Sequence, residues 1–353
     1  MLADPRISWF DASDGQADGG IDLTDQRADD TLHIGTTTPR IVEDQPTKSD
    51  RIFGGTTTTS GLVVLVLLAL VGLFLLLRSR DAFDVAGWSF FTRVEWRTDV
   101  DPPEIGVLGL VAGTVQVAVI AVLIAIPLAV CAALFITDYA SARWRGVLTG
   151  LIDLLAAIPS LLYGIWGWLL LSEQLAPLSA FLARHLSWIP FFATGDDPEL
   201  VQSMFIAGVV VSLMVLPIVA SVTREVFAQT PPGEKEAALA LGGTRWGMIR
   251  MVVLPYGRAG IIGGSMLGLG RALGETIAVT LLLPQLPLLT WQVLESGGAT
   301  VSGFIATRAG ADDFTTSGLM AAGLVLFAGT LATNMAASVI VSRSRSGVGV
   351  ETV

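Results

Sequence analysis

Arg271 and Glu275 are two charged residues inside an apolar run over residues 259–283, which ends at Pro284. A charge at mid-membrane is costly, so such residues normally face the interior of a helix bundle or a water-filled cavity. Chemistry alone leaves two interpretations open. The two residues form either a buried ion pair that fixes helix packing, or part of a substrate path in which the guanidinium fork meets a tetrahedral oxyanion.

The helical geometry of this run predicts where Arg271 points. Gly260, Gly264 and Gly268 follow the small-xxx-small spacing that lets helices pack closely. At about 100° per residue, Arg271 lies about 20° around the helix from Gly260 and from Gly264. We therefore expect Arg271 on the protein-facing side, with Glu275 one turn further on, in reach of an i,i+4 pair.

A second candidate site lies in the loop over residues 223–258, just before this run. Residues 234–241 are strong helix formers, and Pro231 precedes them, as is common at a helix start. The small side chains of Ala237 and Ala238 would allow another protein to approach closely. This pattern predicts a short helix that lies across the inner membrane face.

The same loop contains signals for a turn and a second helix. Gly242 and Gly243 end the first helix, and a second short helix is predicted from Thr244 to about Val253. Leu254-Pro255 is then expected to turn the chain back into the next apolar run. The loop is therefore predicted to be a helix–turn–helix.

The elements that must position these residues are apolar segments of membrane-spanning length. The chain has 353 residues, of which 52% are hydrophobic and only 15% charged. A helix of about 20 residues crosses a hydrocarbon core of about 30 Å. Six segments qualify, so we expect an all-α polytopic membrane protein surrounded by lipid; they lie near residues 59–77, 108–136, 147–171, 204–222, 259–283 and 317–341.

These segments divide the chain into four parts. Residues 1–57 carry 11 acidic and 5 basic residues and few large apolar groups, so we expect a disordered tail. The first transmembrane helix and its outer loop follow over residues 58–107. The core of the fold is predicted over residues 108–342, and residues 343–353 form a short C-terminus.

Charge indicates the orientation and excludes one class of partner. With both termini inside, the inner loops and C-terminus hold nine Lys and Arg residues, against six in the outer loops. Positive-inside reasoning therefore favours cytoplasmic termini. The net charge of −10 argues against a nucleic-acid partner.

Other candidates are weaker. Pro159 should bend the third segment and free a backbone carbonyl near Ser160 and Tyr163, whose side chains then either line the path or pack. Packing is also the expectation for Asn334. Cys131 is expected to be a small buried apolar residue, and Asp153 an acid at the membrane interface. His33 and His185 have no partners at metal-ligand spacing, so no metal site is predicted.

The loop before the fifth segment resembles the EAA signature of ABC importer permeases. Glu236-Ala237-Ala238, then Gly242, then Val252-x-Leu254-Pro255 reproduce its spacing, with Val252 in the place of the usual Ile. The resemblance implies that this loop is the coupling helix, which docks in a groove of the ATPase subunit. The chain has no phosphate-cradling Walker loop, so ATP and Mg would be bound by partner ATPase subunits.

The fifth segment resembles the permease subunits of phosphate-specific ABC importers, in particular the PstC type. The similar stretches are GRALGETIAV, IPSLLYGIWG at 158–167 and LPYGRAGIIGG at 254–264. The resemblance implies the type I importer permease fold, with no enzymatic activity in this chain. It also implies that Arg271 and Glu275 act in phosphate transport, with Thr276 beside them in the path.

The resemblance further implies a set of partners. They are a second permease of the PstA type, two ATPase subunits and an extracytoplasmic phosphate-binding protein, in a bacterial cell membrane. Three alternatives stay open: a permease for another oxyanion such as molybdate or sulfate, an ATPase-independent secondary anion transporter, and a non-transporting membrane scaffold.

Overall fold

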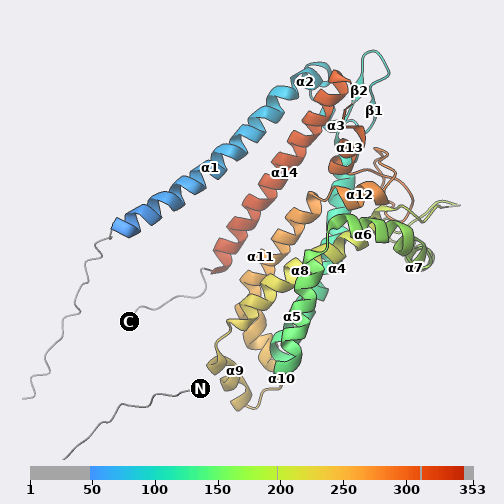
Figure 1. The fold of residues 1–353 in the computed structure, drawn as a ribbon. Helices are drawn as coiled ribbons and strands as arrows, with labels where there is room; N and C mark the ends of the chain where they lie inside the picture. The colour runs from blue at the N-terminus through green and yellow to red at the C-terminus, as the bar shows by residue number, and fades with distance from the viewer. Residues whose placement is uncertain (1–47, 197, 311, 346–353) are drawn as a thin grey trace, which may run out of the picture. The chain divides into compact units, whose positions relative to one another are not determined.

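The computed structural model describes residues 48–196, 198–310 and 312–345. Contacts divide the chain into two units, Met1–Ser60 and Gly61–Val353; helix α1 runs from the first into the second, and the bundle described below belongs to the second. The long helices, shown in Figure 1, are α1 (Lys48–Arg78), α4 (Leu108–Leu134), α5 (Ala142–Ala157), α7 (Ser172–Leu186), α8 (Met204–Ala228), α11 (Leu254–Leu273) and α14 (Asp313–Arg345).

Shorter elements connect these helices. They are α2 (Arg80–Ala86), α3 (Ser89–Thr92), β1 (Trp96–Arg97), β2 (Glu104–Ile105), α6 (Ser160–Trp166), α9 (Pro232–Ala240), α10 (Arg245–Met248), α12 (Ile277–Leu282) and α13 (Val301–Arg308). Three π-helical segments complete the order: η1 (Phe135–Tyr139), η2 (Gly167–Leu171) and η3 (Ile249–Val253).

The helix α1 begins earlier than the sequence predicts. The expected disordered tail over residues 1–57 lies mostly outside the described residues, but residues 48–57 already belong to α1. Four hydroxyls near its start each donate to the carbonyl four residues back; they belong to Thr57, Thr58, Thr59 and Ser60. These bonds satisfy the polar side chains inside the helix itself.

The prediction of membrane-spanning helices is confirmed. Among the described residues, five helices are long and apolar enough to cross a membrane, and a sixth span results if a bent pair of helices counts as one. That pair, Ala142–Ala157 and Ser160–Leu186, is bent by 86°. Because the break falls at Ile158 and Pro159, the predicted bend at this proline is also confirmed.

The centre of the bundle is formed by α4, α8 and α11, which run side by side (Figure 1). Small residues allow this close packing: Ala118, Ala121, Ala125 and Ala129 line the buried face of α4. A Cβ on Gly208 of α8 would stand only 2.5 Å from a side-chain carbon of Ile120. The backbones of α4 and α8 are therefore almost in contact.

A second core lies at the end of the bundle where β1 and β2 pair, with Trp96 opposite Ile105. Here the Trp96 ring packs edge-on against Phe304 of α13, with ring centroids 5.0 Å apart. Phe90 and Leu110 are fully buried in the same cluster. We call this the hairpin end, and the opposite end, which carries α9 and α10, the α9 end.

The apolar run that the sequence predicts as one span over residues 259–283 is divided in the structure. α11 ends at Leu273, α12 is a separate short helix, and an extended segment then leads to α13. Gln285 fixes this segment, because its side chain donates to the carbonyl of Val279 and accepts from the N–H of Thr300. The single-span prediction was wrong because apolar composition does not reveal where a backbone unwinds.

Candidate functional site

Glu275 lies in the unwound segment 274–276 between α11 and α12. Its side chain is 6% exposed, and its carboxylate accepts a hydrogen bond from the N–H of Ala278 at 3.4 Å. Its backbone carbonyl accepts a bond from the hydroxyl of Ser302 at 2.6 Å. An unwound backbone at membrane depth is tolerated where such bonds satisfy it, and broken helices of this kind build the binding sites of many transporters.

Arg271 forms a long ion pair with this anchored carboxylate. Its Nη2 lies 3.9 Å from Oε2 of Glu275, and its side chain is 43% exposed. The i,i+4 pairing predicted from the sequence is therefore confirmed, although the helix ends between the two residues. The glutamate is fixed by the fold, whereas the guanidinium remains accessible to an anion from outside the chain.

The glycine face of α11 packs on α8, but Arg271 does not share it. The buried residues of this stripe are Gly257, Gly260, Gly264, Gly268 and Ala272. Each step of four residues turns the stripe by about 40° around the helix. At this end of α11 the stripe therefore contains Ala272 and not Arg271. Arg271 is therefore exposed in this chain, and its place on the protein-facing side of the helix stays a prediction.

Ser160 and Tyr163 lie on α6, which packs against α12, the helix that follows the break after Leu273. α6 packs so closely on α12 that a Cβ on Gly164 would stand 2.9 Å from the Cα of Ala278. The Tyr163 hydroxyl donates to the carbonyl of Leu155 at 3.0 Å, across the bend at Pro159. It therefore satisfies the carbonyl that this bend frees. Membership of Ser160 and Tyr163 in a substrate path stays a prediction.

Thr276 sits in the unwound segment itself. Its hydroxyl donates to the carbonyl of Gly274 at 3.2 Å, and its own carbonyl accepts from the hydroxyl of Thr280. These bonds hold the short turn that leads into α12. Thr276 is thus next to the anchored Glu275, and its place in the substrate path stays a prediction.

The remaining candidates lie elsewhere. Asn334 of α14 approaches Gly270 of α11, as expected of a packing residue, and the His185 ring stacks on Phe181. Cys131 is exposed on α4, so the expectation of a buried thiol was wrong. His33 lies outside the described residues, within which no group of three His, Cys, Asp or Glu side chains could hold a metal ion.

The predicted helix–turn–helix is present at the α9 end. α9 is followed by a turn at Gly242, whose φ of +84° explains the glycine, and then by α10. Glu236 and Ala237 are exposed on α9, whereas Ala238 is half-buried against a small cluster that includes Met248 and Leu254. The exposed side of this segment is therefore free to meet another protein.

Two features of this segment differ from the sequence prediction. The second helix does not turn at Leu254-Pro255: α10 continues through η3 into α11, and Arg245–Leu273 is one membrane-length helix. Pro255 lies just after the π-helical segment η3, where the regular α-helical hydrogen-bond pattern is interrupted. The segment also exposes large apolar side chains that the sequence analysis did not single out, namely Leu239, Leu241, Trp246 and Met251.

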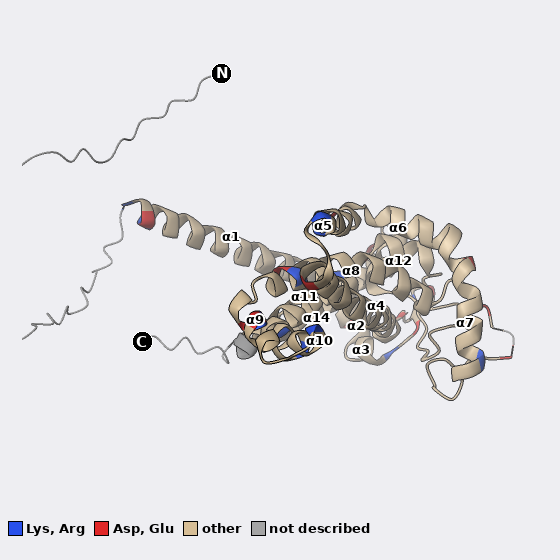
Figure 2. Cartoon of the chain, turned by 90° about the horizontal axis from the view of Figure 1, so that it is seen from below, with Lys and Arg blue, Asp and Glu red and all other residues tan. Residues whose placement is uncertain are grey.

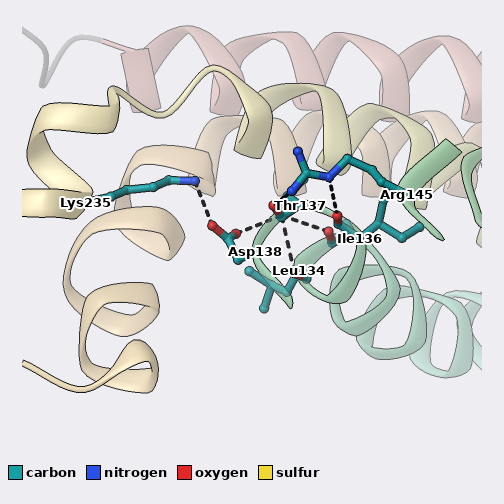
Figure 3. A network of polar contacts seen from close by, with 7 residues as sticks. Leu134, Ile136, Thr137, Asp138, Arg145 and Lys235 are labelled. Atoms are coloured by element: carbon teal, nitrogen blue, oxygen red, sulfur yellow. Dashed lines mark hydrogen bonds and ion pairs between the residues drawn. The ribbon is translucent and has the colours of Figure 1, made fainter. Parts of the chain in front are cut away.

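A polar network joins α9 to the end of α4, and sequence reasoning missed it (Figure 3). Lys235 of α9 makes a 2.8 Å ion pair with Asp138 of η1. Arg145 of α5 donates to the carbonyls of Ile136 and Thr137 beside it. The one signal in the sequence was an isolated acid at the end of an apolar run.

Together the bundle, the broken helices and the exposed helix–turn–helix define a membrane transport permease. A protein-family model described as the binding-protein-dependent transport system inner membrane component matches residues 125–346. The chain therefore belongs to this family of multi-pass inner membrane proteins.

Curated relatives extend the similarity over most of the chain. The phosphate transport system permease protein PstC 2 of Mycobacterium tuberculosis is 39% identical over 305 residues, which are 85% of this chain and 94% of that protein. The phosphate transport system permease protein PstC of Xylella fastidiosa is 36% identical over 313 residues, 87% of this chain and 95% of that protein. A bacterial ABC transporter involved in the import of alginate is similar in structure over 83% of this chain, with a TM-score of 0.49 and 18% identity, a likeness too distant to bear on cargo.

Proposed function

We propose that this chain is the transmembrane permease subunit of an ATP-driven phosphate importer. The assignment of phosphate as the transported substrate rests on the 39% identity, over 85% of the chain, to a protein named as a phosphate transport system permease. The geometry of the site supports it: an accessible guanidinium stands beside an anchored carboxylate at a helix break. A guanidinium with several parallel donors suits the oxygens of inorganic phosphate.

In this proposal Arg271 binds phosphate. When the path is empty, Glu275 pairs with Arg271, and when phosphate enters, Glu275 and the anion compete for the guanidinium. The bond from the Ala278 N–H to its carboxylate and the bond from the Ser302 hydroxyl to its backbone carbonyl keep Glu275 in place in both states. The structural alternative, a pair that only fixes packing, is less well supported because the Arg271 side chain is 43% exposed.

The proposed partners follow from the family and from the α9 end. The exposed apolar side chains of α9, α10 and η3 would dock in an ATPase subunit, which binds ATP and Mg. A complex would contain two ATPase subunits, a second permease of the PstA type and an extracytoplasmic phosphate-binding protein. ATP binding would bring the two ATPases together, move the α9 segments and open the path outward, and reversal would release phosphate inward.

Charge supports the orientation, with the α9 end and both termini in the cytoplasm. Figure 2 shows basic positions in blue on α5 and beside α10. Arg143 and Arg145 belong to α5, and Arg245 begins α10. An excess of Lys and Arg marks the cytoplasmic side of membrane proteins.

The test is phosphate import and phosphate-stimulated ATP hydrolysis by the reconstituted complex, with the substitutions Arg271→Ala and Glu275→Ala. We expect both variants to assemble and hydrolyse ATP at the basal rate, but to lose import. Arg143→Ala, which removes an exposed arginine on α5, is the control and should leave import unchanged. Loss of assembly in both variants would instead make the pair structural.

The cargo is tested with the wild-type complex. Unlabelled phosphate should compete with labelled phosphate for import, whereas sulfate and molybdate should not. Competition by sulfate or molybdate alone would overturn the phosphate assignment, and import without a bound ATPase would overturn the ATP-driven mechanism.

A further inference from the structure

The Asp138–Lys235 ion pair links two segments that are far apart in the sequence. Lys235 directly precedes Glu236 of the exposed α9 segment, and Asp138 lies in η1, the continuation of α4. Lys235 Nζ and Asp138 Oδ1 are 2.8 Å apart, and the side chains are only 21% and 7% exposed. Such a shielded pair is screened much less by salt than a surface pair.

The Asp138 carboxylate is held from a second side. Its Oδ2 lies 2.8 Å from the hydroxyl of Thr137, whose single proton is shared between this oxygen and the carbonyl of Ala133. Arg145 donates to two further carbonyls of η1, at 3.0 and 2.8 Å. These bonds satisfy carbonyls at a helix end, where a cation is also favoured electrostatically. The end of α4 is therefore a firm anchor for Lys235.

The backbone of α9 itself packs on other elements. Its contacts are with α10 and η3, where Ala238 is half-buried. The Lys235 side chain reaches from α9 toward η1, as Figure 3 shows. The ion pair thus adds a polar link from α9 to η1, beside the apolar cluster that Ala238 of α9 shares with Ala133 of α4.

From α4 the contacts continue without a gap to the candidate site. α4 packs against both α8 and α11 along the bundle. Gly208 of α8 sits against Ile120 of α4, and Gly268 of α11 sits against Val215 of α8. Arg271 lies one turn beyond Gly268. Displacement of the end of α4 would therefore reach the helix that carries Arg271.

We propose that Asp138 and Lys235 form a transmission pair, which makes α4 follow α9 when a partner ATPase moves α9. This inference rests on the proposed function, because it assumes an ATPase that docks at α9. The pair is a positioning device and does not touch the transported anion. Without it, ATP hydrolysis and import become uncoupled.

The experiment measures phosphate imported per ATP hydrolysed in the reconstituted complex. Lys235→Met and Asp138→Asn should each lower this ratio by about fivefold or more, the size of a typical coupling between sites, while hydrolysis continues. Lys235→Arg keeps the charge and should restore most of the ratio. The matched control is Glu234→Gln, which removes an exposed charge one residue away on α9 and should change nothing.

A double variant tests whether the two residues act as a unit. If the pair acts as a unit, Lys235→Met combined with Asp138→Asn should be no worse than either single change. An unchanged ratio in the single variants, with import by the wild type intact, would overturn the transmission pair alone. Absence of phosphate import in the wild type would overturn the proposed function. A fall in assembled complex with an unchanged ratio would make the pair structural.

Discussion

The hydroxyl of Ser302, on α13, donates a 2.6 Å hydrogen bond to the backbone carbonyl of Glu275, in the unwound segment between α11 and α12. Both residues are buried, at 8% and 7% exposure. This bond ties the helix break to an element 27 residues further along the chain.

Ser302→Ala should lower the free energy of unfolding by about 1–3 kcal/mol, because it leaves a buried carbonyl without its partner. Denaturant titration of the purified protein in detergent measures this. Ser265→Ala is the matched control, since the Ser265 hydroxyl donates to a carbonyl within its own helix, at Ile261. An equal loss in both variants would contradict the assigned role of Ser302.

Gly268→Ala should disrupt the contact between α11 and α8. A Cβ at this position would stand 2.6 Å from Cγ1 of Val215 and 2.9 Å from Cγ2 of Val219, and neither branched side chain can move far. We expect a loss of about 1–3 kcal/mol in the free energy of unfolding, as for an overpacked core.

Two variants check the cause of that loss. Gly150→Ala on α5, where a Cβ would meet nothing within 4 Å, should instead stabilise by about 0.5–1 kcal/mol. Val215→Ala combined with Gly268→Ala should cost less than the sum of the two single changes. Additive costs would argue against a clash between these two positions.

Trp246→Ala should weaken the association with a partner ATPase without changing the stability of the chain. Trp246 is 59% exposed on α10, so its removal leaves no cavity. A buried tryptophan at an interface contributes about 2 kcal/mol or more, which is roughly a 30-fold loss of affinity. The measurement is co-purification at graded ATPase concentrations. Trp188→Ala, at a site 77% exposed beyond α7, should have no effect.

Tyr163→Phe tests whether Tyr163 belongs to the substrate path. Because its hydroxyl already donates to the Leu155 carbonyl, its removal should cost about 1 kcal/mol of stability and leave the KM for phosphate import unchanged. Uptake measured over a range of phosphate concentrations decides the matter. A raised KM with unchanged stability would place the hydroxyl in the path.

The sequence predicted well those features that depend on local chemistry. The two glycines after α9 predicted the turn at Gly242, because only glycine adopts its positive φ without strain. Pro159 predicted the bend in the third segment, since proline cannot continue the hydrogen-bond ladder. The spacing of Arg271 and Glu275 predicted their pairing.

Features that depend on tertiary contacts were not predictable from the sequence. The break after Leu273 is stabilised by Ser302, which is distant in sequence, so the apolar run gave no sign of it. The exposure of Arg271 depends on the direction in which the contact stripe with α8 turns around α11, and a difference of one position along the helix moves a residue into or out of that stripe. The Asp138–Lys235 pair joins positions 97 residues apart, and spacing alone carries no information about such a contact.

Because the hydroxyls near the start of α1 bond to carbonyls of their own helix, this end of the span can lie in water or in hydrocarbon. Arg51 and Arg78 are separated by 26 uncharged residues, about 39 Å of helix against a hydrocarbon core of about 30 Å. Thr57–Ser60 can enter the hydrocarbon at little cost, because their hydroxyls are already bonded to their own helix. The first span, which is longer than the hydrocarbon core, can therefore tilt to match membranes of different thickness.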